Sequence, residues 1–104
     1  MTKWNVEELC GYTPITTFWD DFSIADCFGK SAVQDTFNRA FAEWKSNYKY
    51  LTELAMVLNH KSWQHYETNT ALMELYSDLY YVVYDYATEN LKSEEIRYFF
   101  EILD

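Results

Sequence analysis

The amino-acid sequence predicts an all-α fold, a compact array of about five helices, bundle-like or orthogonal, in one domain over residues 1–104. The chain has only two glycines and one proline, too few for the tight turns of β-sandwiches and barrels. Apolar residues make up 49% and aromatic residues 20%, a composition that excludes a disordered chain. The apolar residues also recur at helical spacing, and the chain is long enough to close one core without disulfides or metal.

The first two predicted helices precede Gly29. Asn5 and Glu8 form a capping box, which predicts a short helix near the N-terminus. A second helix is predicted to start at Pro14, because proline suits the first helical position, and to end by Gly29. A break at Ser23 is left open. The apolar stripe of this second helix comprises Ile15, Phe18, Trp19, Phe22 and Ala25.

Residues 32–66 fit either one long helix or two. Two helices are favoured because the apolar pattern can restart around Ser46 and Asn47. Ser31 and Gln34 form a capping box for the first of them. The two apolar stripes are Val33, Phe37, Ala40, Phe41 and Trp44, then Leu51, Leu54, Ala55, Leu58, Ser62 and His65.

The C-terminal third predicts two more helices, one capped by Asn69 over residues 69–90 and one capped by Ser93 over residues 94–103. Glutamates in the first turn of the last helix agree with the helix dipole. The predicted core comprises Trp19, Phe22, Phe37, Phe41, Leu54, Leu58, Leu72, Leu79, Val83 and Phe99.

The stretch from Glu67 to Glu89 holds five carboxylates and no lysine or arginine. Read as one helix, the carboxylates follow one another at steps of seven, four, seven and four residues, which places all five within about 60° of arc. These carboxylates are Glu67, Glu74, Asp78, Asp85 and Glu89. The opposite side carries Leu72, Leu75, Tyr76, Leu79, Val82, Val83 and Tyr86.

Tyr80, Tyr81 and Tyr84, together with Met73, widen this apolar side past half the circumference. A peripheral helix needs a stripe of only about 100°. The helix is therefore either central in the bundle or covered by a second chain, in a homodimer or with another partner. Tyrosine suits a partly solvated interface because its ring can be buried while its hydroxyl keeps a hydrogen-bond partner.

The charge distribution indicates the kind of partner. The net charge is −9, and residues 53–104 carry ten acids against three bases. Such a surface repels nucleic-acid backbones and anionic membranes and favours either solubility or a basic partner. In a sharper version of this hypothesis, the carboxylate row mimics nucleic-acid charge and occupies a basic DNA- or RNA-binding cleft. The alternative is that the carboxylate row is simply a solvent-exposed helix face without a binding function.

A helix-turn-helix is the alternative for residues 23–41, where Ala25 and Gly29 match the spacing of the motif and Gln34, Asn38 and Arg39 could read bases. Asp35 stands where the motif requires an apolar residue, and few cations lie nearby to hold phosphate. Two packed helices joined by a glycine turn explain the pattern better.

Enzyme chemistry, cofactors and metals are not predicted. His60 and His65 are five residues apart and cannot share an ion as histidines four apart do; His60 is predicted to face solvent and His65 to be a hydrogen-bonded core histidine. The N-terminus lacks the apolar segment of a signal peptide, and no apolar run could span a membrane. A cytoplasmic location is therefore expected, with Cys10 and Cys27 as buried thiols.

Three stretches, FWDDFSIADCFG from Phe18, EWKSNYKYLTEL from Glu43 and ENLKSEE from Glu89, resemble small acidic proteins carried by phages and conjugative elements of gut-type bacteria. The group has no established activity, so the resemblance transfers no site residue. It implies an accessory protein that binds other proteins. The predicted function is a non-enzymatic interaction or regulatory module that acts through its acidic helix face and tyrosine-rich flank.

Overall fold

The computed structural model describes residues 16–103, and this part of the chain is helical with short connections. The helices are α2 (Phe18–Asp26), α3 (Lys30–Trp44), α4 (Tyr48–Gln64), α5 (Thr70–Asn90) and α6 (Ser93–Leu103). The predicted all-α fold is confirmed. The predicted helix at Asn5 lies outside the described residues, as do Pro14 and Cys10.

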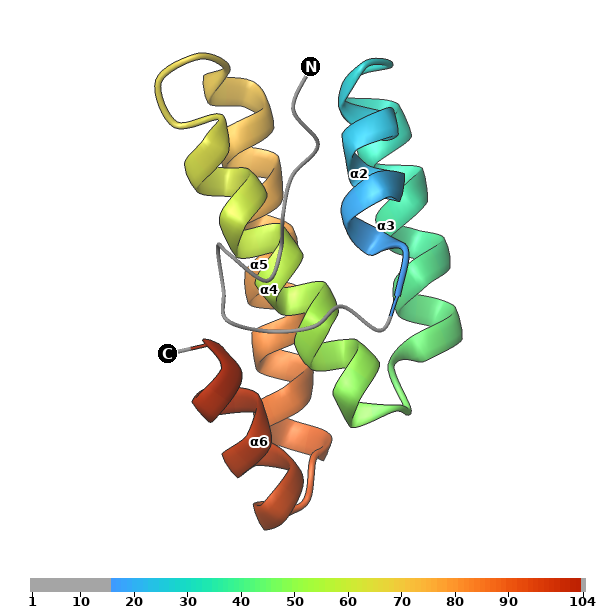
Figure 1. Ribbon diagram of the computed structural model, residues 1–104, viewed down its shortest axis with the longest axis vertical. Coiled ribbons are helices and arrows are strands. Elements are labelled where there is room, and N and C mark those ends of the chain that lie inside the picture. Colours follow the sequence, from blue (N-terminus) through green and yellow to red (C-terminus); the bar gives the residue numbers. More distant parts are fainter. Residues whose placement is uncertain (1–15, 104) are drawn as a thin grey trace.

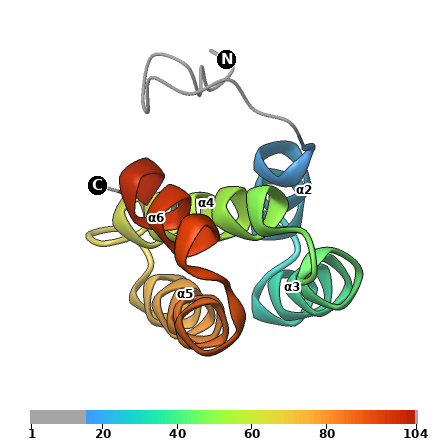
Figure 2. The ribbon, with the colours of Figure 1, turned by 90° about the horizontal axis from the view of Figure 1, so that it is seen from below.

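The helices form two antiparallel pairs with α6 added at one end (Figure 1). The α2–α3 pair lies beside the α4–α5 pair, and α6 packs on α4 and α5 at the end of the molecule where α5 finishes. Seen end-on, α4 occupies the middle of the array, with α2 and α3 on one side and α5 and α6 on the other (Figure 2). Helix α4 contacts all four other helices.

The central position of α4 explains why it is buried around its whole circumference. Eight consecutive residues, 51–58, are buried, whereas the apolar pattern alone predicts one buried side. The two polar residues in this run have partners: the Thr52 hydroxyl donates to the Tyr48 carbonyl at 2.7 Å, and the Glu53 carboxylate accepts from the Thr16 hydroxyl. A helix buried on all sides needs such partners because an unpaired polar group in the core is costly.

Two helices begin at asparagine caps: Asn69, which the sequence predicts as a cap, and Asn47, where the sequence predicts only that the apolar pattern restarts. Residues 32–66 form two helices, and the break is capped by Asn47, whose side chain accepts from the Lys49 and Tyr50 N–H groups. Asn69 likewise accepts from the Leu72 N–H at 3.1 Å. Both asparagines satisfy first-turn donors that have no partner within the helix.

Three predicted boundaries are wrong. Residues 16 and 17 are bends, so α2 begins at Phe18 instead of near Pro14, and it runs through Ser23 without a break. Helix α3 begins at Lys30, one residue before the predicted Ser31 cap, because Gly29 takes the N-cap position with φ of 100°, a conformation that costs glycine little.

Helix α6 shows the third difference. It begins at Ser93 itself, and the cap is made by Glu95, whose carboxylate accepts from the Lys92 N–H at 3.0 Å. Ser93 is therefore the first helical residue and does not cap the helix.

Nine of the ten predicted core residues are buried, and the tenth, Phe41, is half-buried against the core. Phe41 stacks on Phe37 at a centroid distance of 5.3 Å and meets the Tyr86 ring edge-on at 5.3 Å. It therefore links α3 to α5 at the margin of the core.

Candidate functional site

The carboxylate row lies along one exposed face of α5. Glu74, Asp78, Asp85 and Glu89 are all exposed and keep the spacing of four, seven and four residues. Glu67 does not belong to this row, because it lies in the turn between α4 and α5, before the Asn69 cap. The row thus has four carboxylates, spread over about 22 Å of helix.

No cation neutralises this row within residues 16–103. The ion pairs there, Lys61–Asp26 and His65–Asp26, both lie elsewhere. The four α5 carboxylates therefore project their charge into solvent at the spacing that the helix imposes.

Two exposed apolar side chains border the row. Tyr81 is 57% exposed and Val82 is 45% exposed. At 100° per residue they fall on opposite edges of the carboxylate arc. The exposure of Val82 corrects the prediction that it belongs to the buried side of the helix.

The predicted tyrosine flank is divided between surface and core. Tyr80 and Tyr84 are half-buried and pack against the core, and the Tyr84 ring lies 5.8 Å from Phe100 and 6.4 Å from Phe99. Only Tyr81 of the three stands out into solvent. The wide apolar side of α5 is accordingly covered by other helices of its own chain, α4 above all, with α3 and α6 at its margins.

A polar cluster, comprising Ser23, Asp26, Lys61, His65 and Tyr76, joins α2 to α4 and α5. The Lys61 ammonium donates to Asp26 Oδ2 at 3.1 Å and to Ser23 Oγ at 2.9 Å. His65 Nε2 lies 3.2 Å from Asp26 Oδ2, and the Tyr76 hydroxyl donates to Asp26 Oδ1. One carboxylate thus has three partners.

The cluster is deeply placed. Lys61 is 1% exposed and Tyr76 is fully buried, and the His65 ring lies flat against the Tyr76 ring at 5.7 Å. Burial raises the pKa of the Tyr76 hydroxyl, and its hydrogen bond to Asp26 raises that pKa further. The hydroxyl therefore stays protonated as a donor to Asp26. Because Asp26 of α2 is hydrogen-bonded to Lys61 of α4 and to Tyr76 of α5, the cluster ties three helices together.

His65 is hydrogen-bonded as predicted, whereas His60 differs from its prediction. His60 is half-buried and packs against Trp19 at a ring distance of 5.6 Å. Burial lowers the pKa of His60 below its usual 6.5.

The depressed His60 pKa predicts a pH dependence of stability. The folded state binds the proton less readily than the unfolded chain, so the contribution of His60 is fully present above about pH 6.5 and is lost as the pH falls through the lowered folded pKa. Replacing His60 by glutamine should reduce the loss of stability on acidification from pH 7 to pH 5, measured by urea unfolding. An unchanged pH profile in H60Q, or an imidazole that titrates at 6.5 or above in the folded protein by NMR, would contradict this.

Cys27 corrects a further prediction. It is exposed at the C-terminal end of α2, with its thiol 3.7 Å from the Ser23 carbonyl. The prediction of a buried thiol fails because Cys27, whose backbone is still helical, falls about 140° around the helix from buried Phe22 and so faces solvent.

The proposed helix-turn-helix over residues 23–41 gains no support from the arrangement of α2 and α3. The two helices run side by side in opposite directions (Figures 1 and 2), whereas the motif crosses its helices at about 90–120°. Residues 16–103 also contain no group of three or more His, Cys, Asp or Glu side chains that could hold a metal ion.

Comparisons with protein-family models, with curated proteins and with solved structures yield no match to this chain. The resemblance to proteins of mobile elements therefore stays a prediction. Among the helices of residues 16–103, none has the length and apolar character that crossing a membrane requires.

Proposed function

We propose that the protein is a non-enzymatic interaction module that binds a basic protein through the exposed face of α5. The observation that carries this proposal is the row of four exposed carboxylates, which has no cationic partner in the described part of the chain and has an exposed apolar side chain on each edge.

This combination suits protein recognition. Rows of like charge steer an oppositely charged partner and fix its register, while aromatic side chains that become buried supply most of the binding energy. Tyr81 is the anchor in this scheme, and Val82 extends the apolar contact beyond the opposite edge of the row.

The partner on this face is another protein and not a second copy of the chain. A symmetric dimer interface brings the same surface patch of two subunits together. Here it would set the carboxylates of one α5 against those of the other, and like-charge contacts across an interface cost several kcal/mol.

A nucleic-acid mimic is the second candidate, favoured by the uninterrupted sign of the row. No lysine or arginine occurs between Ser62 and Leu91, and the steps of four and seven residues correspond to about 6 and 10.5 Å along the axis. On this hypothesis the basic partner is a DNA- or RNA-binding protein, and the row occupies its nucleic-acid cleft. Competition by duplex DNA or by RNA for the captured partner separates a mimic from other binders of basic proteins.

The double charge reversal D78K/E74K should weaken binding of a basic partner, captured from the native cell, by about a hundredfold or more, because each lysine would face a cation across the interface. Isothermal titration calorimetry measures the loss of affinity, and a second salt concentration shows how far salt screens the electrostatic contribution.

The matched control is D20K/E101K, which changes the net charge equally at exposed positions on α2 and α6. Circular dichroism verifies the fold of both variants. If D78K/E74K and D20K/E101K lose the same affinity for the partner, the loss comes from net charge alone and not from the α5 face. Unchanged affinity in D78K/E74K would rule out the α5 face as the binding surface.

A further inference from the structure

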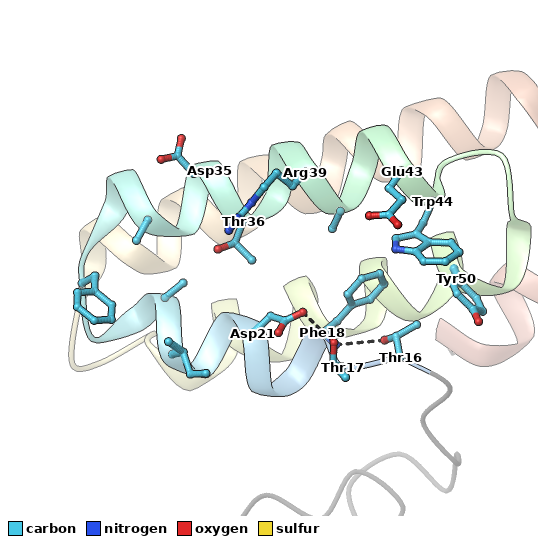
Figure 3. A pocket seen from close by; sticks show the side chains of 15 residues that line it. Thr16, Thr17, Phe18, Asp21, Asp35, Thr36, Arg39, Glu43, Trp44 and Tyr50 are labelled. Atoms are coloured by element: carbon cyan, nitrogen blue, oxygen red, sulfur yellow. Dashed lines mark hydrogen bonds between the residues drawn. The ribbon is translucent and has the colours of Figure 1, made fainter.

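A second surface, separate from the α5 face, is a groove of about 810 Å³ between α2 and α3 (Figure 3). One wall is the outer ridge of α2 and the other is the facing ridge of α3, which runs antiparallel to it. Trp44 and Tyr50 close one end, and the α2–α3 turn closes the other.

Small side chains on the inner walls keep the groove open. Ala25, Ala32 and Ala40 line it, together with Thr36. Larger apolar side chains stand at the end nearest the turn: Ile24 is 61% exposed and Phe28 is 77% exposed. Two adjacent apolar side chains of this size and exposure at the edge of a groove indicate a surface that another molecule covers.

The charges on the two ridges are mostly negative. Asp21 on α2 and Asp35 and Glu43 on α3 line the groove, against a single cation, Arg39. All four side chains are exposed, and none of them is in an ion pair within residues 16–103. A groove that has both apolar and polar lining, and more acids than bases, complements a ligand that is apolar on one side and basic at its margins.

We propose that the α2–α3 groove binds an amphipathic helical segment of another protein, with lysine or arginine flanking its apolar stripe. From Ala32 to Glu43 the α3 ridge extends over about 16 Å, which matches a bound helix of about three turns. Such a helix would place apolar residues at i, i+3 or i+4, and i+7 into the groove, with its cations beside Asp35 and Glu43.

Charge also decides between this partner and the occupants that the chain itself could provide. Residues 1–15 directly precede Thr16, which lines the groove, but they carry two glutamates and only one lysine. A second copy of the protein carries a net charge of −9. Both would add acid to a rim already rich in acid, whereas a basic segment neutralises it.

The test uses the full chain and a synthetic 15-residue peptide with leucines at helical i, i+3, i+4 and i+7 spacing and lysines on both flanks. Amide shifts in ¹⁵N spectra should change in residues 17–28 and 32–44 and saturate with peptide concentration. A peptide of the same composition with scrambled order, and one with glutamate in place of each lysine, should bind at least about tenfold more weakly.

Two variants locate the binding. I24K, at an exposed position, and the pair D35K/E43K should each weaken peptide binding about tenfold or more, while D78K/E74K on α5 should change it less than twofold. Loss of peptide binding in the α5 variant alone would overturn the groove assignment while supporting the proposed function of α5. Loss of peptide binding in I24K and D35K/E43K but not in D78K/E74K supports the groove, even if the proposed function of α5 is wrong.

The inference would be overturned by equal binding of the scrambled or the glutamate peptide, by shift changes confined to residues that do not line the groove, or by contacts in NOE spectra of the free protein between residues 1–15 and the groove. The last result would assign the groove to the chain's own N-terminal segment. A dimer whose dissociation frees the groove would assign it to a second copy and overturn the inference equally.

Discussion

Replacement of Asp26 by alanine should lower the free energy of unfolding by about 3–5 kcal/mol, a large fraction of the about 5–15 kcal/mol typical of a domain. The physical reason is the position of Lys61, which is 1% exposed and has its ammonium 3.1 Å from the Asp26 carboxylate. Without that carboxylate the ammonium stays buried with Ser23 as its one acceptor within residues 16–103, and the Tyr76 hydroxyl keeps only its long contact of 3.5 Å to the Phe22 carbonyl there. Urea unfolding followed by circular dichroism measures the loss.

Two further variants identify the cause. D20A, at an exposed aspartate of the same helix, should stay within about 0.5 kcal/mol of the parent protein. In D26A/K61M the buried ammonium is gone, and a large part of the lost stability should return, since replacing a buried ion pair by apolar groups is often nearly neutral. If D26A/K61M is as unstable as the sum of D26A and K61M, the two side chains do not interact and the explanation is wrong.

The polar cluster has a consequence for the groove. Asp26 holds the C-terminal end of α2 to Lys61 and His65 of α4 and to Tyr76 of α5. Ala25 and Ile24, which line the groove, lie one and two residues before Asp26 in α2. The cluster therefore holds the α2 wall of the proposed docking surface in place. Its hydrogen bonds are directional, so they fix the position of α2 more closely than apolar contacts alone would.

The helices and most of the core could be predicted from local patterns because these patterns record which side chains avoid water. Asn47 and Asn69 begin helices where they stand, since a capping side chain acts on N–H groups two or three residues away. The Ser31 prediction failed because a glycine with positive φ at residue 29 had already begun the helix. Gly29 and Ser31 are both plausible helix starts in the sequence, and only the backbone conformation shows which of the two begins the helix.

The candidate surfaces were predictable in part. Periodicity places Glu74, Asp78, Asp85 and Glu89 on one face without any knowledge of the neighbours, and Glu67 drops out because the helix begins after it. Val82 is exposed because at 100° per residue it falls at the edge of the carboxylate arc, whereas Tyr84 falls farther from that arc and is half-buried. The assignment of Val82 to the buried side was therefore wrong on helical geometry itself.

The polar cluster and the groove depend on tertiary packing and were not predicted. The sequence did contain one signal of the cluster: Lys61 falls in helical register with Leu54, Leu58 and His65, so a cation lies on the apolar side of α4. A lysine at such a position requires an acid from another helix. No local rule names Asp26 as that acid, and none places the ridges of α2 and α3 side by side.

Replacement of Phe99 by alanine should cost about 3–5 kcal/mol, the usual range when a fully buried phenylalanine is truncated. Phe99 is fully buried and is the one residue of α6 that is buried outright, and its ring meets Tyr84 of α5 and Phe100. Phe99 is thus the most deeply buried contact of α6, while Phe100 and Leu103 pack against the core beside it.

Hydrogen exchange can separate local from global effects of F99A. The amides of residues 93–103 should lose protection more than those of α4, because a short helix without its anchor opens by itself. F100A is the matched control, and it should cost less, since Phe100 is only half-buried. Equal losses in the two variants would contradict the anchoring role of Phe99.

The same variant also separates stability from binding. The carboxylates of α5 are exposed, whereas Phe99 packs against Tyr84 in the core. At a temperature where F99A remains folded, its affinity for a basic partner should therefore stay within about threefold of the parent protein, since only contacts outside the α5 face have changed. A much larger loss of affinity would mean that the partner also contacts α6, and the proposed interface would then have to extend beyond α5.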